Sequence, residues 1–483
     1  MKNHIVKSLF VCCSILAFAL LVQPSVLAQP CAMAQSSAAP APDGAPWTWN
    51  TFLGGNQWED GYGVAVDTAG NIYVAGMSKG SWGTPIRPYG GHEDAFVAKL
   101  NSSGVLVWNT FLGSATGQDE GYAIAVDSNG NVVVTGESTH SWGSPINAHS
   151  QEAPDVFVAR LNTNGALLWN TFMGGASIDR GFGVTVDGSG DVYVTGESHG
   201  RWGNPVNPPS SNIINQEVFV AKLNRNGARQ WNTFMGDRNG EDIARAIAFD
   251  DGKVFVAGYS KNSWGSPKRP HSGDFYGDAF AASLNSSNGQ RQWNTFLGGA
   301  GTDQGRGIAA RSGQVYVTGY SYKTWGSPVA PFPGNSDNVY AARLDSNGNL
   351  IWNTFMGGGD WEDDWGNAIS VAPNGKVYVV GQSADSWGSP IHPFQDDWDA
   401  FAAELNSNGV RQWHTFIGGD DTDYGFAVAA TNTNLYVVGE SHVAYGDWGS
   451  PVRPGSGQYD AFAVSLYTGP PLTEHIHMPM ILR

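Results

Sequence analysis

The chain has 483 residues, of which 64 are glycine, 19 are tryptophan and only 14% are charged. This composition is typical of a turn-rich, aromatic-rich globular protein, and it excludes a disordered or a helical chain. The formal net charge of -17 argues against a nucleic-acid groove, which needs clustered lysine and arginine, and against adsorption to anionic lipid.

The first 34 residues have the pattern of an export signal. Lys2 and Lys7 precede an apolar run, residues 9–22, which is too short to span a membrane. Cleavage after Ala28 or after Ala34 fits the small-residue rule. All three cysteines lie in this leader, so the exported part has no disulfide. We expect a secreted or cell-surface protein with no membrane insertion once the leader is removed.

Residues 35–46 are rich in alanine, proline, serine and glycine and predict a flexible linker. From residue 47 one unit of about 60 residues is repeated seven times. Its most constant part is Trp-Asn-Thr-Phe, which begins at Trp49, Trp108, Trp169, Trp231, Trp293 and Trp352, and returns as Trp-His-Thr-Phe at Trp413. We expect one domain over residues 47–467, followed by a tail over residues 468–483.

The second unit shows what each repeat contains. Strands are predicted over residues 122–127, 131–136, 155–161 and 166–173, with Asn-Gly turns after the first and the third. A strand that is apolar on both faces, such as the run of valines from Val132 to Val134, must be covered on both sides. The repeat therefore predicts an all-β, seven-bladed propeller of four-stranded antiparallel blades. The absence of a helical period excludes a helical solenoid, and a β-helix has shorter coils.

The two ends of the array predict that the ring is closed. Residues 49–53 match the fourth strand of a blade, whereas residues 460–466 match the third strand, after which the pattern stops. The N-terminal strand would therefore complete the last blade. Because closure leaves no free array end, we expect a monomer.

Three runs carry a resemblance to a known family. They are G-x-A-V-D-x-x-G-N-x-Y-V-x-G at Gly63–Gly76, D-A-F-V-A-K-L at Asp94–Leu100, and W-N-T-F-L-G. The chain resembles the bacterial seven-bladed beta-propeller repeat family (SBBP repeats) over about residues 47–467. The resemblance implies the fold and export, and no common activity. The Ser-Trp-Gly-x-Pro pattern of the long loop departs from the family.

An acidic residue recurs between the fourth strand of one blade and the first strand of the next. These residues are Glu59, Asp119, Asp179, Asp242, Asp303, Asp364 and Asp423. In a propeller such connections gather on one face near the channel, where a hard cation such as calcium could bind. The alternative, which we favour, is that each acid caps its own turn. No metal site and no cofactor are predicted.

A tryptophan followed by Gly-x-Pro recurs in the long loop between the second and third strands. The seven are Trp82, Trp142, Trp202, Trp264, Trp325, Trp387 and Trp448. Exposed, the rings would be stacking platforms for sugars or aromatic ligands; buried, they would be wedges that hold the loop, which the fixed neighbours favour. Four tryptophans outside the repeat, Trp58, Trp361, Trp365 and Trp398, are further ligand-binding candidates, and three of them accompany an acidic patch.

One catalytic motif is rejected. Residues 196–200, Gly-Glu-Ser-His-Gly, match the nucleophile elbow G-x-S-x-G, but an elbow needs a strand that turns into a helix, and none is predicted. No catalytic residue is assigned, and the protein is expected not to be an enzyme.

The leading hypothesis is an exported, non-enzymatic binding or scaffold module that uses the face with the Trp-Gly-x-Pro loops and takes a protein or glycan partner. A carbohydrate-binding or carbohydrate-active propeller (lectin, lyase or glycosidase) is one alternative. A structural component of the cell envelope is the other.

Overall fold

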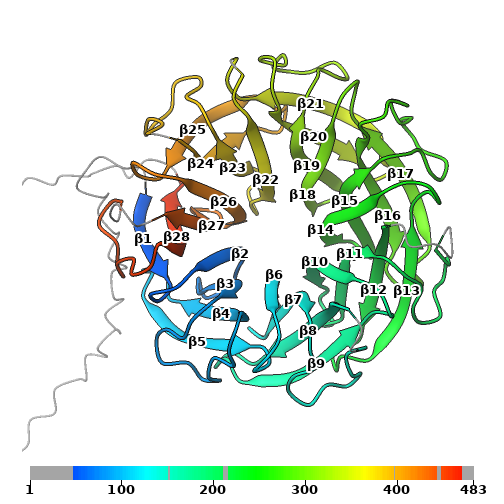
Figure 1. Cartoon of the computed structure of the whole chain (residues 1–483). Coiled ribbons are helices and arrows are strands. Elements are labelled where there is room, and N and C mark those ends of the chain that lie inside the picture. The colour runs from blue at the N-terminus through cyan, green and yellow to red at the C-terminus, as the bar shows by residue number, and fades with distance from the viewer. Residues whose placement is uncertain are drawn as a thin grey trace, which may run out of the picture. The chain divides into compact units, whose positions relative to one another are not determined.

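The computed structural model describes residues 47–150, 153–209, 216–359, 361–395, 397–442 and 448–469. Within these ranges the chain forms seven four-stranded sheets, arranged as blades around an axis (Figure 1). The predicted leader, linker and residues 470–483 of the predicted tail lie outside the described residues.

The blades are numbered here in chain order. Blade 1 contains β2 (Glu59–Val66), β3 (Ile72–Ser78), β4 (Asp94–Leu100) and β5 (Leu106–Leu112). Blade 2 contains β6 (Asp119–Val126), β7 (Val132–Ser138), β8 (Asp155–Leu161) and β9 (Leu167–Met173). Blade 3 contains β10 (Asp179–Val186), β11 (Val192–Ser198), β12 (Glu217–Leu223) and β13 (Arg229–Met235). Blade 4 contains β14 (Asp242–Asp250), β15 (Lys253–Ser260), β16 (Asp278–Asn285) and β17 (Arg291–Leu297).

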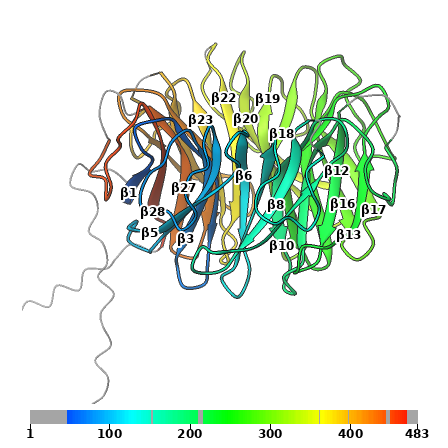
Figure 2. The same cartoon turned by 60° about the horizontal axis from the view of Figure 1, so that its bottom comes forward.

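The remaining blades have the same order. Blade 5 contains β18 (Asp303–Arg311), β19 (Gln314–Ser321), β20 (Asn338–Asp345) and β21 (Leu350–Met356). Blade 6 contains β22 (Asp364–Val371), β23 (Val377–Ser383), β24 (Asp399–Leu405) and β25 (Arg411–Ile417). Blade 7 contains β26 (Asp423–Ala430), β27 (Asn434–His442) and β28 (Tyr459–Tyr467), and β1 (Trp47–Leu53) is its fourth strand. The first strand of each blade is the one nearest the axis (Figures 1 and 2).

Ring closure by the N-terminal strand is confirmed. β1 pairs antiparallel with β28, with Phe52 opposite Phe462 and Thr51 opposite Ala463. Strands from the two ends of the array therefore belong to one sheet (Figure 1).

The predicted strands exist, but the first strand of each repeat begins earlier than predicted. In blade 2 it begins at Asp119 and not at residue 122, because Asp119 and Glu120 pair with Ser138 and Glu137. A register shift between Gly121 and Ala123 interrupts the alternation that marks a strand, which hid these residues from the sequence pattern. The repeated acid is thus part of the innermost strand and not of the preceding connection.

The core lies between blades and not within one blade. One cluster joins Val133 and Val158 of blade 2 to Val184 and Val192 of blade 3. Six further clusters of the same kind are formed by the described residues. Each sheet is therefore covered on both faces, as its apolar strands require.

Candidate functional site

The tryptophan of each Trp-Gly-x-Pro loop is buried. Trp142 is 4% exposed, and its ring centroid lies 5.5 Å from that of Phe157 and 5.8 Å from that of Phe172. The other six rings are also 4–6% exposed: Trp82, Trp202, Trp264, Trp325, Trp387 and Trp448. These rings hold the loop against the blade and present no stacking face to a ligand, so the wedge interpretation that the sequence favoured agrees with the burial of the rings and the platform alternative does not.

The same loop covers the outer edge of its blade. In blade 1 the N–H of Ile86 donates to the carbonyl of Asn109 (2.9 Å), and the N–H of Phe111 donates to the carbonyl of Arg87 (3.2 Å). The side-chain amide of Asn109 donates to the carbonyl of Trp82 (2.8 Å). A fourth strand without such a cover would expose unpaired backbone groups to other chains. The length of the repeated loop is accounted for by this pairing.

Each acid of the repeated column occupies its own blade interface. Asp119 accepts the backbone N–H of Ser114 (2.9 Å) and the hydroxyl of Ser138. The other six, Glu59, Asp179, Asp242, Asp303, Asp364 and Asp423, accept a turn N–H in the same way. Burial raises the pKa of six of the seven to about 7 and that of Asp303 to about 8. Among the described residues, no group of three or more His, Cys, Asp or Glu is placed to hold a metal ion.

A second acid, which the sequence reasoning missed, lies beside the first at most interfaces. A Cβ on Gly113 would lie 2.3 Å from Oδ1 of Asp94 and 2.9 Å from Oδ2 of Asp119, so only glycine allows this approach. The pairs are Asp460 with Glu59, Asp94 with Asp119, Asp155 with Asp179, Glu217 with Asp242, Asp278 with Asp303, and Asp399 with Asp423. Asn338 takes the second place beside Asp364. The available signal was the acid at the start of the third strand in six of the seven blades.

Aromatic side chains form an arc around the axis. Its rings, with neighbouring centroids 5.4–6.0 Å apart, belong to Tyr320, Trp365, Trp398, Tyr424, Phe426, Tyr62, Tyr122 and Phe182. Two of the four predicted non-repeat tryptophans, Trp365 and Trp398, therefore contact each other in this arc. Trp58 instead stacks on Tyr459 at 4.8 Å, and Trp361 is 78% exposed. The four are not one patch.

Acids that differ from blade to blade accompany this arc at the end of the channel that bears the long loops. Asp60 accepts the indole N–H of Trp58 and the hydroxyl of Tyr62, both at 2.7 Å. Burial, together with the nearby charge of Asp60, raises the pKa of Glu440 to about 8. Burial likewise raises the pKa of Asp60, and it raises that of Glu120 to about 7.

Two further acids of this group share one cation. Glu137 accepts the hydroxyl of Tyr122 (2.8 Å) and Nε of Arg180 (2.6 Å), and Glu197 accepts Nη1 of Arg180 (2.9 Å). We call Asp60, Glu120, Glu137, Glu197 and Glu440 the axial acid group. Its members come from blades 7, 1, 2 and 3.

Two arginines lie on the opposite side of the channel. Arg245 of blade 4 lies over the ring of Phe182 with 4.4 Å between Cζ and the centroid, and Arg306 of blade 5 lies 5.0 Å from the ring of Trp365. Asp337 lies near Arg306 and Trp365, so this side of the entrance carries both charges. For Asp60, Glu120 and Arg180 the sequence signal was the position directly after the repeated acid, which varies from blade to blade; Arg245 and Arg306 lie three positions after their acid.

The rejected catalytic motif lies in an ordinary strand end. Ser198 is buried, and its hydroxyl donates to the carbonyl of Gly200 (2.8 Å) and accepts the indole N–H of Trp202 (3.1 Å). A hydroxyl held in this way is a structural link between strand and loop. Over the described residues 199–209, β11 is followed by the loop that carries Trp202.

The closed ring of seven antiparallel blades defines a β-propeller, a fold compatible with a binding or scaffold module. The family model of the SBBP beta-propeller repeat matches residues 49–81, 107–141 and 172–201. The chain thus carries repeats of the SBBP family, and the resemblance seen in its sequence is confirmed. In the described part of the chain, no helix is long and apolar enough to cross a membrane.

Relatives are distant and longer. The regulatory protein FlaEY of Caulobacter vibrioides is 25% identical over 367 residues, which cover 70% of this chain and 37% of FlaEY. The uncharacterized WD repeat-containing protein L264 of Acanthamoeba polyphaga mimivirus is 26% identical over 230 residues, which cover 39% of this chain and 16% of L264. The chain therefore spans well under two thirds of either relative. BamB from Moraxella catarrhalis has a TM-score of 0.39 and 12% identity, with 84% of this chain and 85% of BamB covered.

Proposed function

We propose that this protein is a non-catalytic binding module that holds a basic segment of a protein partner at the channel entrance on its loop-bearing face. The observation that carries the proposal is the break in sevenfold repetition at this entrance. The acids of the repeated column, the buried loop tryptophans and the loops that cover the outer edge recur in every blade. The axial acid group does not recur in this way. Where an otherwise repeated scaffold varies at one place, that place is expected to be functional, and binding of a partner is the simplest function.

Charge and aromatic character both favour a cationic partner. Among the described residues, Arg180 is the one cation that forms ion pairs with the axial acid group, through Glu137 and Glu197. Burial raises the pKa of Glu120 to about 7 and that of Glu440 to about 8, so both are partly protonated near neutral pH, and an incoming lysine or arginine would restore their charge. The rings of Tyr62 and Tyr122 supply faces that attract a cation.

The proposed setting is an exported monomer. The formal charge of -17 keeps single rings apart and steers basic partners toward them. The covered blade edges remove the strand surfaces through which rings would otherwise associate.

The test is binding of a fluorescent ten-residue arginine peptide to the whole chain, measured by anisotropy at two salt concentrations. We expect Glu120→Gln together with Glu440→Gln to weaken binding at least tenfold. The matched control is Asp251→Asn, since Asp251 is exposed in the turn after β14, at the opposite end of the strands. An equal loss of binding free energy for each carboxyl group removed, in the double variant and in the control, would show that only net charge matters, and the axial proposal would then be wrong.

One observation favours a second candidate, a carbohydrate-active propeller. Asp60 and Glu440 are adjacent carboxyl groups, and both pKa values are raised. Glycoside cleavage uses an acid that keeps its proton near neutral pH and a second carboxyl group about 5–9.5 Å away, so a bound sugar would have to separate Asp60 from Glu440. Sugar release from a polysaccharide panel, abolished by Glu440→Gln, would favour this candidate. Binding of neither peptide nor glycan would leave the structural envelope role.

A further inference from the structure

Each buried loop tryptophan of blades 1 to 6 has an arginine over its ring, and that arginine comes from one of two places. At three interfaces it comes from the loop of the preceding blade: Arg453 over Trp82, Arg87 over Trp142, and Arg269 over Trp325, at 5.4–5.7 Å. At three others it begins the outer strand of the same blade: Arg229 over Trp202, Arg291 over Trp264, and Arg411 over Trp387, at 4.9–5.4 Å. No blade uses both.

Where the arginine comes from the preceding blade, it fills the interface. Nη1 and Nη2 of Arg87 donate to the carbonyls of Phe111 (2.9 Å) and Gly113 (2.7 Å). Arg269 and Arg453 make the same pair of bonds at their interfaces. The carbonyls at the end of the outer strand are thereby satisfied.

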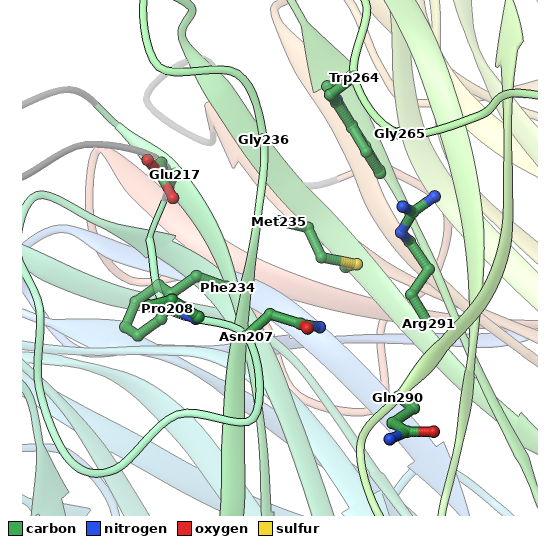
Figure 3. Close-up of a pocket in the computed structure, with 10 residues that line it drawn as sticks. All are labelled: Asn207, Pro208, Glu217, Phe234, Met235, Gly236, Trp264, Gly265, Gln290 and Arg291. Carbon is green, nitrogen blue, oxygen red and sulfur yellow. The ribbon is translucent and has the colours of Figure 1, made fainter.

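Where the arginine belongs to the following blade, a cavity remains. Asn147, Asn207 and Ala330 stand at the loop position that arginine occupies elsewhere. The three cavities have volumes of about 210, 330 and 380 Å³. A methionine ends the outer strand at each of them, Met173, Met235 and Met356, whereas leucine does so at the filled interfaces. Figure 3 shows Met235 and Arg291 on the same cavity, with Glu217 on its other side.

In each cavity the hydrogen bonding of an arginine is incomplete among the described residues, although Arg229 and Arg291 each bond one asparagine. No carboxylate of the described residues forms an ion pair with Arg229, Arg291 or Arg411, and burial alone lowers their pKa values. Arg229 donates one N–H to Asn232 (3.2 Å), which leaves its other donors available. In the described chain, the carbonyls of Phe234 and Gly236 receive no guanidinium like that of Arg87 at the filled interface.

We propose that the three cavities bind a free α-amino acid. Its carboxylate would meet the arginine, its ammonium would meet the two strand carbonyls, and an apolar side chain would pack on the methionine. Guanidinium pairs with carboxylate through two parallel bonds, and methionine adapts to apolar groups of varied shape. Glu217 and Asp155 each line one cavity and add to its ammonium-binding side. The volumes suit a ligand of this small size.

The experiment uses the whole chain with ¹³C-labelled methionine methyl groups, followed by NMR during titration with L-leucine. The methyl signals of Met173 and Met235 should shift saturably, with that of Met356 responding more weakly because no acid lines its cavity. Acetyl-leucine, which lacks the ammonium, and leucinamide, which lacks the carboxylate, should each bind at least tenfold more weakly. Met77, in β3, is the internal control that should not move.

A variant that copies a filled interface makes the test specific. Asn207→Arg together with Arg291→Leu places arginine where Arg87 and Arg269 stand, and keeps Met235 as a reporter. The Met235 signal should then stop responding to L-leucine, while the Met173 signal in the same molecule still shifts and shows that the ring is folded. The proposal is overturned if no pocket methyl shifts at 10 mM L-leucine, on the order of the weakest specific affinities. It is also overturned if leucinamide or acetyl-leucine binds as well as leucine, or if Met235 responds unchanged in the variant.

Discussion

Arg87 of blade 1 lies over the indole of Trp142 in blade 2, with 5.5 Å between its Cζ and the ring centroid. In blade 3 the arginine that lies over the ring of Trp202 is Arg229, which belongs to the same blade. The two arrangements exclude each other because both place one guanidinium over one buried ring, and a second cation beside it would be repelled.

The exchange of these two arrangements can be measured in a double-mutant cycle. Arg87→Asn removes a cation from the ring and two donors from buried carbonyls, so we expect a loss of about 1–3 kcal/mol in the free energy of unfolding. Leu167→Arg alone adds a second cation and should also destabilise. The double variant reproduces the arrangement of blade 3. Its loss in the free energy of unfolding should be about 1–2 kcal/mol smaller than the sum of the two single losses. If urea denaturation shows that the loss in the double variant equals the sum of the two single losses, the two arrangements do not substitute for each other.

The buried loop tryptophans should behave as core residues. Trp142→Ala should reduce the free energy of unfolding by about 3–5 kcal/mol because it leaves a large cavity between two phenylalanines. The control is Trp361→Ala, which removes a ring that is 78% exposed and should change stability by less than about 0.5 kcal/mol. Similar melting temperatures for the two variants would show that Trp142 is not a wedge.

Ring closure should be sensitive to the loss of one strand. A chain that begins at residue 54 lacks β1, and with it ladder hydrogen bonds of about 1 kcal/mol each and the burial of Trp47 and Phe52, about 2–3 kcal/mol apiece. We expect it to aggregate or to fail to fold. The control begins at residue 47 and should melt like the whole chain. A monomeric product of the shorter chain with unchanged melting, by light scattering and calorimetry, would count against closure.

Stability should fall as pH rises from about 4 to 8. The native pKa of the interface acids is raised to about 7, or about 8 for Asp303, above the values of exposed carboxyl groups. The folded ring therefore binds more protons than the unfolded chain in this window, so the stabilisation is complete below about pH 4 and is lost as pH passes the native pKa. Asp119→Asn should flatten the dependence of melting temperature on pH, and Asp251→Asn should not. A melting temperature that rises from pH 5 to pH 8 would contradict the assignment.

Much of this molecule was determined by its sequence. Seven copies of Trp-Asn-Thr-Phe or its His variant, with paired Asn-Gly turns, specify the strands, the blades and the closing role of Trp47–Leu53, because repeated local chemistry must fold in a repeated way. Strands apolar on both faces could be satisfied only by neighbouring sheets.

The tertiary structure alone decided which groups meet. Asp60, Glu120 and Glu440 are separated by 60 to 380 residues and are brought to one channel entrance because closure places blade 7 beside blade 1. The sequence shows whether a loop carries an arginine, such as Arg87, or another residue at that position, such as Asn147. What this difference does at the interface depends on the orientation of the rings of Trp142 and Trp202. Sequence periodicity records which face of a strand is buried; the direction of a side chain across an interface is set by the packing of the next blade.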